Sequence, residues 1–186
     1  MPMIPRLSIA TFAAALSLSA LVAQADTPVS YTERGKALFS FDAPDFWTVH
    51  VGGPRDLSDP KVNQSRSVSR LIGLQPATES RIWVGFISPA GVTDFADAKE
   101  YLSEIGPFLV KNAEIEKRAE KVIGGRSART VSGRGNRDGK AVNFTAIAID
   151  LPHNRMAISV VVMEAGFGQD NLAGVNRMFA SFRVGG

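Results

Sequence analysis

The sequence predicts an α+β fold in which an antiparallel β-sheet is flanked by helices. Two nearly continuous apolar runs rich in β-branched residues, 141–149 and 156–163, are typical of strands in the centre of a sheet. Several shorter stretches alternate apolar and polar residues, as half-buried strands do. Two further segments, which begin near Asp94 and Asp170, repeat apolar residues at helical spacing.

The N-terminal third of the chain predicts two strands between less regular segments. Residues 26–35 are polar and rich in turn formers, so we expect a loose lead-in without regular structure. Pro44 separates two alternating stretches and predicts a tight turn between two strands. The apolar positions of these strands are Ala37, Phe39 and Phe41, then Trp47, Val49 and Val51. The polar stretch 55–67, with a turn signal at Asp59-Pro60, predicts an exposed loop.

A hairpin followed by a helix is predicted next. Residues 68–74 and 82–86 both alternate, and Trp83 and Ile87 are apolar on the second face, so this part of the sheet should be covered on both sides. Asp94 is a good helix N-cap, and Gly106-Pro107 should break or kink the helix that it starts. The apolar stripe of this helix consists of Phe95, Ala98, Leu102 and Ile105.

The C-terminal half predicts a meander of strands and a closing helix. Residues 115–123 and 127–132 should be extended on either side of a turn at Gly124-Gly125, and 133–139 should form a hairpin loop. The two apolar runs are joined by a second hairpin turn at 150–154. Asp170 should cap the last helix, after which Phe182 and Val184 fold back. Its apolar stripe consists of Leu172, Val175, Met178 and Phe179.

The first 25 residues have the pattern of a cleavable export signal. Arg6 precedes an apolar run, 7–22, and the small-x-small sequence Ala23-Gln24-Ala25 predicts cleavage before Asp26. An uncleaved anchor is the alternative, but the run is shorter than the roughly 20 apolar residues that span a bilayer. Cleavage of 25 from 186 residues leaves 161, which suits a single domain over 26–186. We therefore expect a periplasmic protein without a membrane span.

Composition excludes several kinds of site. The chain has no cysteine, so disulfides, a lipid-bearing cysteine, a cysteine nucleophile and a cysteine-bound zinc are excluded. Its two histidines, His50 and His153, lack a metal-binding spacing, and no Gly-x-Ser-x-Gly turn presents a nucleophile. Trp47 and Trp83 could line a small-molecule pocket, although aromatic residues on strands are usually core. We predict no catalytic residue, metal ligand or cofactor.

Charge is unevenly distributed along the chain. The formal net charge is +3, and six carboxylates in residues 94–116 are followed by eight basic residues in 117–140. Arginine forks suit phosphate or carboxylate groups, so part of the basic segment is a candidate surface for an anionic partner. Solvated charges on strands and turns give the same pattern, and that alternative stays open. The candidate residues are Arg126, Arg129, Arg134, Arg137 and Lys140.

The order of these elements resembles the PsbP-like superfamily. Its similarity rests on Phe39-x-Phe41-x-x-Pro44-x-x-Trp47, the turn Gly125-Arg126-Ser127-Ala128, and the closing Ala180-Ser181-Phe182-Arg183. The superfamily includes extrinsic photosystem proteins, a Ran-binding import factor and bacterial periplasmic proteins. The resemblance implies an α/β/α sandwich and a habit of binding partners. No functional residue is carried over, because these motifs specify packing.

Three functions follow from these observations. The first is a non-enzymatic periplasmic binding or accessory protein, whose partner is another protein or an envelope component and not a nucleic acid. The second is a carrier of a small ligand or lipid, with a pocket between sheet and helix. The third and weakest is a hydrolase. An empty concave apolar pocket would favour the carrier, whereas a filled core with one charged face would favour the accessory protein.

Overall fold

The strands that the structure describes form one large sheet and two small ones. The computed structural model describes residues 26–53, 55–59, 64–68, 70–78, 81–166 and 168–185. The predicted signal peptide lies outside the described residues, among which no helix is long and apolar enough to cross a membrane. The large sheet is antiparallel, with the order β3-β6-β7-β11-β10-β9-β8, and the small sheets are β1-β2-β12 and β4-β5. The strands are β1 Thr27–Glu33, β2 Lys36–Ala43, β3 Trp47–Gly52, β4 Arg55–Asp59, β5 Gln64–Val68, β6 Leu71–Pro76, β7 Ile82–Ile87, β8 Lys111–Ile123, β9 Arg126–Arg137, β10 Lys140–Leu151, β11 Arg155–Glu164 and β12 Arg183–Val184.

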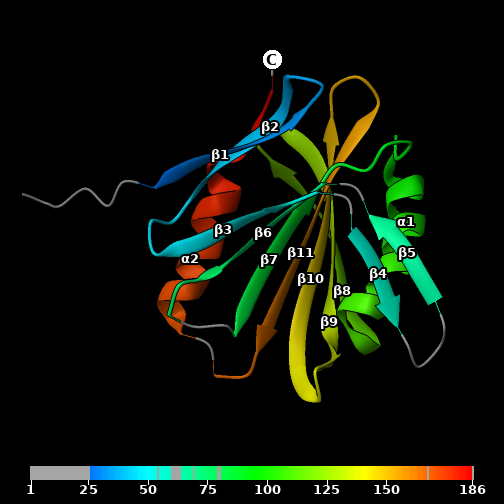
Figure 1. The fold of residues 1–186 in the computed structure, drawn as a ribbon, viewed down its shortest axis with the longest axis vertical. Helices are drawn as coiled ribbons and strands as arrows, with labels where there is room; N and C mark the ends of the chain where they lie inside the picture. The colour runs from blue at the N-terminus through cyan, green and yellow to red at the C-terminus, as the bar shows by residue number, and fades with distance from the viewer. Residues whose placement is uncertain are drawn as a thin grey trace, which may run out of the picture.

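Helices cover the large sheet on both faces, as the sequence predicts. Helix α2, Gln169–Ala180, lies on one face together with the three-stranded sheet, and α1, Phe95–Leu109, lies on the other (Figure 1). Neighbouring residues of β7 show this division, because Phe86 packs in the core on the α2 side and Ile87 packs beneath α1. The fold is therefore α+β, an antiparallel sheet between two helical layers.

The two apolar runs are confirmed as central strands. β11 pairs with β10 along its whole length, from Val142 opposite Glu164 to Leu151 opposite Arg155. The turn between them places His153 and Asn154 in the left-handed backbone region, with φ of 62° and 53°. Asn tolerates that region better than most residues, which explains a tight turn at this position.

Helix α1 begins as predicted but ends later. The Asp94 carboxylate accepts hydrogen bonds from the backbone N–H groups of Ala96 and Asp97 at 2.7 and 2.9 Å, which satisfies two donors of the first turn. The helix then continues through Gly106-Pro107 to Leu109, so the predicted break is wrong. Pro107 lies in the last turn, where its missing N–H removes one hydrogen bond and leaves no later turn to disrupt.

The predicted loose lead-in and the exposed loop are both wrong, because each contains strands. Residues 27–33 form β1, which pairs with β2 and buries Val29 and Tyr31. Residues 55–59 and 64–68 form the hairpin β4-β5, which lies beside α1 (Figure 1). Asp59-Pro60 was the turn signal there, and Pro60 lies outside the described residues.

The predicted hairpin loop 133–139 is mostly strand. β9 continues to Arg137, and the turn consists of Asp138 and Gly139, both with positive φ. The glycines of this segment permit a close approach of β8, because a Cβ atom on Gly133 would lie 1.9 Å from the Glu114 carbonyl oxygen. Glycine is required at position 133 because β8 lies too close to leave room for a side chain, and not because the chain turns there.

Helix α2 differs from its prediction at one end only. Its N-cap is Gly168, which has no side chain to accept a hydrogen bond, and Asp170 lies in the first turn instead. There its carboxylate is well placed to interact with the positive end of the helix dipole. Val175 and Met178 of the predicted stripe are buried, and Phe182 folds back into the core as expected.

Candidate ligand-binding groove

A large groove lies between α1 and the half of the sheet that ends at β8. Its volume is about 1090 Å³. Helix α1 forms one wall, β9, β10 and β11 form the floor, and β8 forms the outer wall. This is the concave apolar pocket between sheet and helix that distinguishes a carrier from a protein with a filled core.

The floor is built by the register of four antiparallel strands. Residues directly opposite each other in such strands share a face of the sheet. Arg118 of β8 lies opposite Val131 of β9, Val131 lies opposite Ala146 of β10, and Ala146 lies opposite Val160 of β11. This row therefore places one cation at the edge of the sheet and small or β-branched apolar side chains inside the groove.

Helix α1 rests on the sheet by one stripe and leaves the next stripe facing the groove. Ala98, Tyr101 and Ile105 are buried and pack on the centre of the sheet. Phe95 and Leu102, two turns apart on the neighbouring stripe, line the groove and are only partly buried. The partial burial of these apolar side chains leaves a surface that a hydrophobic ligand can cover.

The rim of the groove is basic. Four cations line it, and Glu120 is the one carboxylate among its described lining residues. Glu120 pairs with Arg129, with 3.2 Å between Nε and Oε1, and the Arg129 guanidinium also lies 4.5 Å above the Phe95 ring. The rim cations are Lys99, Lys111, Arg118 and Arg129.

A second, smaller hollow lies on the other flank of α1. Its volume is about 430 Å³, and its lining includes His50, Trp83 and Arg137. The indole of Trp83 lies flat on the sheet above Gly85, where a Cβ atom would be 2.3 Å from the ring. The Arg137 guanidinium lies 5.2 Å from the centre of that ring. Trp83 thus lines a hollow, whereas Trp47 is buried in the core.

The five residues of the predicted anionic-partner surface do not form one patch. Arg129 and Arg137 line the hollows beneath and beside α1. The strand alternation places Arg126 and Arg134 on the opposite face of β9, and Lys140 begins β10. Each of the five is near a carboxylate. The pairs are Arg126–Asp150, Arg129–Glu120, Arg134–Glu116, Arg137–Asp138 and Lys140–Glu164.

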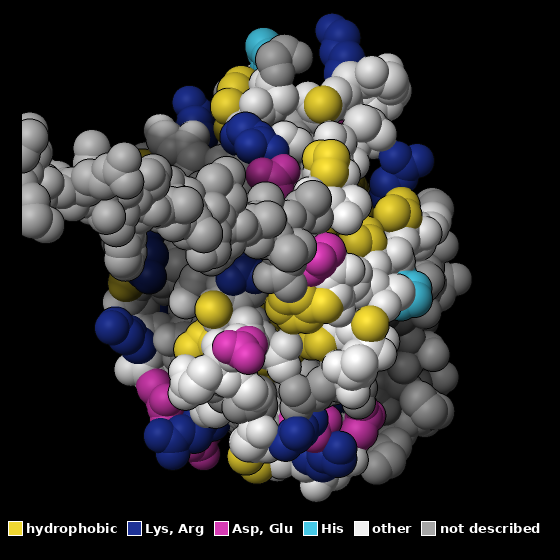
Figure 2. Space-filling view, turned by 90° about the vertical axis from the view of Figure 1, so that its left-hand side faces the viewer, with side chains coloured by type: hydrophobic (Ala, Val, Ile, Leu, Met, Phe, Trp, Pro, Cys, Tyr) yellow, Lys and Arg dark blue, Asp and Glu magenta, His cyan; other side chains and the backbone are white. Residues whose placement is uncertain are grey.

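The two histidines lie apart from each other. Figure 2 shows their side chains, in cyan, at separate places on the surface. His50 is on β3 and His153 is in the turn between β10 and β11, and both are exposed. Among the described residues, no group of three His, Asp or Glu side chains could hold a metal ion.

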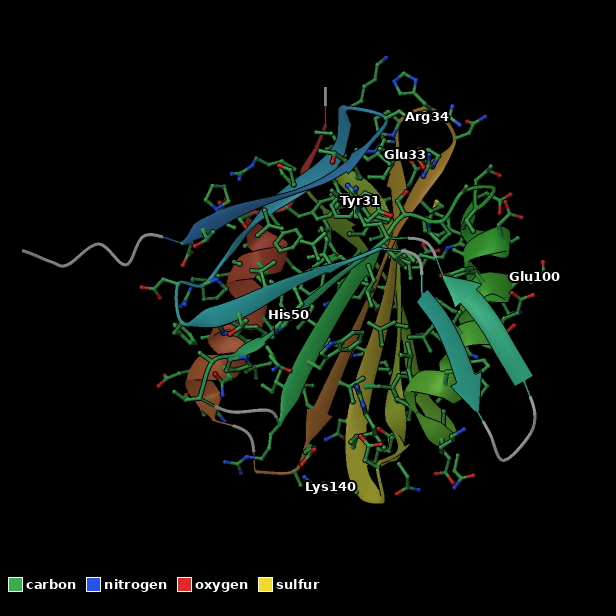
Figure 3. All side chains as sticks on the ribbon, in the orientation of Figure 1. Tyr31, Glu33, Arg34, His50, Glu100 and Lys140 are labelled. Atoms are coloured by element: carbon green, nitrogen blue, oxygen red, sulfur yellow. The ribbon has the colours of Figure 1, made fainter. Side chains whose placement is uncertain are left out.

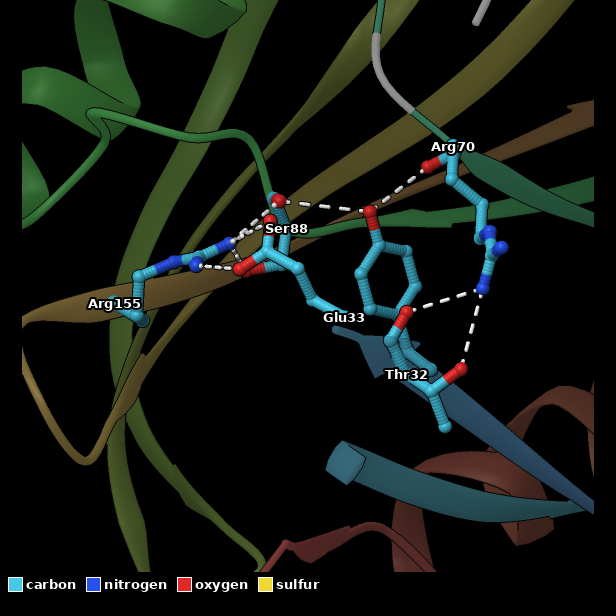
Figure 4. A network of polar contacts seen from close by, with 6 residues as sticks. Thr32, Glu33, Arg70, Ser88 and Arg155 are labelled. Atoms are coloured by element: carbon cyan, nitrogen blue, oxygen red, sulfur yellow. Dashed lines mark hydrogen bonds and ion pairs between the residues drawn. The ribbon is translucent and has the colours of Figure 1, made fainter. Parts of the chain in front are cut away.

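A network of polar contacts ties the three-stranded sheet to the large one (Figure 4). Arg155 of β11 donates to the Glu33 carboxylate of β1, and to the carbonyl and hydroxyl oxygens of Ser88 at 3.0 and 3.1 Å. Beside them the Tyr31 hydroxyl donates to the Arg70 carbonyl oxygen at 3.0 Å, and burial raises the pKa of Tyr31. Arg155 is enclosed by these partners, so the network stabilises the fold and offers no open site.

The Glu33 carboxyl gives this network a dependence on pH. The hydrogen bond from Arg155 lowers the pKa of Glu33 below its usual value. A carboxyl group with a lowered pKa in the folded state stabilises that state above its unfolded pKa, and the contribution disappears as the pH falls through the folded pKa. Glu33→Gln should therefore cost about 1 kcal/mol at neutral pH, since the side chain is 39% exposed and partly screened.

Urea unfolding of the wild type and Glu33→Gln at pH 7, 5 and 3 measures this effect. The difference in unfolding free energy should be present at pH 7 and 5 and should shrink as the pH falls below the ordinary glutamate pKa of about 4.3 and through the lowered pKa of folded Glu33. Glu100→Gln is the matched control. Glu100 is exposed on the outer side of α1 (Figure 3), so this substitution should change stability little at any pH. If the difference in unfolding free energy between the wild type and Glu33→Gln is the same at pH 3 as at pH 7, the Glu33–Arg155 ion pair is not its source.

The antiparallel sheet between two helical layers is the PsbP-like fold. The solution structure of cyanobacterial PsbP, CyanoP, from Synechocystis is similar with a TM-score of 0.50, over 91% of this chain and 98% of that chain, at 14% identity. The crystal structure of LpqN, involved in cell envelope biogenesis of Mycobacterium tuberculosis, is similar with a TM-score of 0.51, over 87% and 91%, at 13% identity. At these identities the likeness concerns the fold alone. No protein-family profile and no curated protein matches the sequence.

Proposed function

We propose that this protein is a non-enzymatic, exported binding protein that carries an amphipathic small molecule in the groove between α1 and the large sheet. The observation that carries the proposal is the groove itself, with an apolar floor of Val131, Ala146 and Val160. Its volume of about 1090 Å³ is slightly above the range of about 300–1,000 Å³ that is usual for small-molecule pockets. Export is supported by the signal-peptide pattern of residues 1–25.

The contacts of the basic residues favour this carrier over an accessory protein that recruits partners by a basic surface. Each of the five candidate residues has a carboxylate of the same chain within ion-pair distance. Such pairs reduce the net charge that a partner would meet. The ligand class that suits an exported carrier is an envelope component with an apolar part. The floor and walls of the groove are mainly apolar, and its charged residues lie at the rim.

Ala146→Trp tests the proposal by filling the groove from its floor. Binding is measured with N-phenylnaphthylamine, an apolar dye whose fluorescence rises on leaving water. The wild type should bind the dye, and Ala146→Trp should bind it at least about tenfold more weakly, because the indole occupies the space that the dye needs. Thermal unfolding of each variant checks that the fold is intact.

Ala141→Trp provides the matched control. Ala141 is on the same strand, β10, but is exposed and does not line the groove. This variant should bind the dye as the wild type does. If the wild type fails to bind the dye, or if both tryptophan variants bind it equally well, the groove is not the binding site.

A further inference from the structure

We propose that the groove selects a single-chain amphiphile with an anionic head, a long-chain fatty acid, whose carboxylate is bound by Lys99 and Arg118. This inference rests on the proposed function and adds the class of ligand to it. Three observations support it: the length of the groove along α1, the distribution of charge around its rim, and the buried apolar end opposite that charge.

The groove has the length of one acyl chain. Residues of α1 from Phe95 to Leu109 line it, which is the whole helix. At about 1.5 Å per residue the helix is about 21 Å long. One leaflet of a bilayer contributes about 15 Å of hydrocarbon, half of its core. A stretched acyl chain and its head group therefore fit along α1.

Three of the four rim cations lie toward one end of that length, whereas the fourth, Lys111, follows the C-terminal end of α1 and already has an interaction partner. Arg129 stacks on Phe95, the first residue of α1, and Lys99 follows one turn later. Glu120, the partner of Arg129, is two residues from Arg118 on the same strand and the same face. Lys99, Arg118 and Arg129 are therefore placed around the N-terminal end of α1, where a head group would lie.

Two of these cations are unpaired in the part of the chain that the structure describes. Glu120 already pairs with Arg129, whereas neither Lys99 nor Arg118 has an ion-pair partner among the described side chains. A carboxylate between them would gain charge-assisted hydrogen bonds. A neutral amphiphile would cover part of the same rim and leave both cations without a counter-charge.

Apart from Lys111, the far end of the groove is mainly apolar. Leu109, Val110 and Phe144 line it, and Val142 and Val162 belong to the same buried cluster. Burial of an acyl chain against this surface contributes about 25 cal/mol for each Å² of apolar area removed from water. The head at the N-terminal end of α1 and the chain directed toward Phe144 give the ligand one orientation.

Competition between two ligands of the same chain length tests the head group. Tetradecanoate and tetradecanol each displace N-phenylnaphthylamine, which gives their dissociation constants. The wild type should bind tetradecanoate roughly tenfold more tightly than tetradecanol. The double variant Lys99→Gln/Arg118→Gln should lose about tenfold in affinity for tetradecanoate and keep its affinity for tetradecanol, because the apolar floor is unchanged.

The control variant is Lys117→Gln/Lys121→Gln, which removes the same net charge from β8 without touching the groove lining. It should bind both ligands as the wild type does. Equal wild-type affinity for the two ligands, or an equal loss of tetradecanoate binding in the control variant, would overturn the head-group inference and leave the carrier intact. If neither ligand nor the dye binds to the wild type, the proposed function itself fails.

Discussion

Phe86→Ala should lower the free energy of unfolding by about 3–5 kcal/mol. Phe86 is fully buried, and its ring stacks on Phe41 with 4.3 Å between the ring centres. It also contacts Phe39 of β2 and Phe179 of α2, at 6.2 and 5.5 Å. One side chain thus joins the large sheet, the small sheet and α2, and its removal leaves a cavity that these three elements cannot easily close.

Urea unfolding followed by circular dichroism measures this loss, with Phe108→Ala as the control. Phe108 is a residue of α1 that lines both hollows and is only partly buried. Its truncation removes less contact and should cost about 1 kcal/mol or less. If Phe86→Ala costs no more than Phe108→Ala, the aromatic cluster is not the main contact between the layers.

Gly133→Ala should cost about 2–3 kcal/mol of stability and weaken binding in the groove. The new Cβ atom would lie 1.9 Å from the carbonyl oxygen of Glu114, a contact with backbone that no side-chain rotation relieves. β8 would have to move away from β9. Because β8 is the outer wall of the groove, the affinity for N-phenylnaphthylamine should fall together with the midpoint of urea unfolding.

Gly106→Ala should change stability in the opposite direction and serves as the control for the stability measurement. A Cβ atom on Gly106 meets no described atom within 4 Å, and alanine in a helix is more favourable than glycine by about 0.5–1 kcal/mol. This variant should be as stable as the wild type or more so. Equal effects of the two substitutions would show that the approach of β8 to β9 is looser than 1.9 Å implies.

The sequence alone is sufficient to predict those helices and strands whose residues carry a strong local signal. The runs in 141–149 and 156–163 predict central strands because both faces of those strands are buried. Asp94 predicts the start of α1 because its carboxylate satisfies backbone donors locally. β1 was missed because only Val29 and Tyr31 face the core, between polar residues that resemble a loop.

The groove could not be predicted in detail, because it depends on strand register. β8 has irregularities in its pairing with β9 between Lys111 and Glu114 and between Ile115 and Lys117. At such bulges two residues oppose one, so the alternation of faces cannot be counted along the sequence. The position of Arg118 on the groove side follows from that register. A basic segment was visible in the sequence, but the division of its residues between two faces was not.

Intermolecular nuclear Overhauser effects (NOEs) between the chain protons of tetradecanoate and the methyl groups of the protein test the central claim most directly, because they arise only between protons in close contact. Val160 and Val161 are neighbours on β11 that face opposite sides of the large sheet, the groove and the α2 core. If the groove carries the chain, the methyl groups of Ala146 and Val160 should show NOEs to the ligand, whereas those of Val161 and Val175 should show none. NOEs to Val161 and Val175, or none to Ala146 and Val160, would contradict a carrier that holds its ligand between α1 and the sheet.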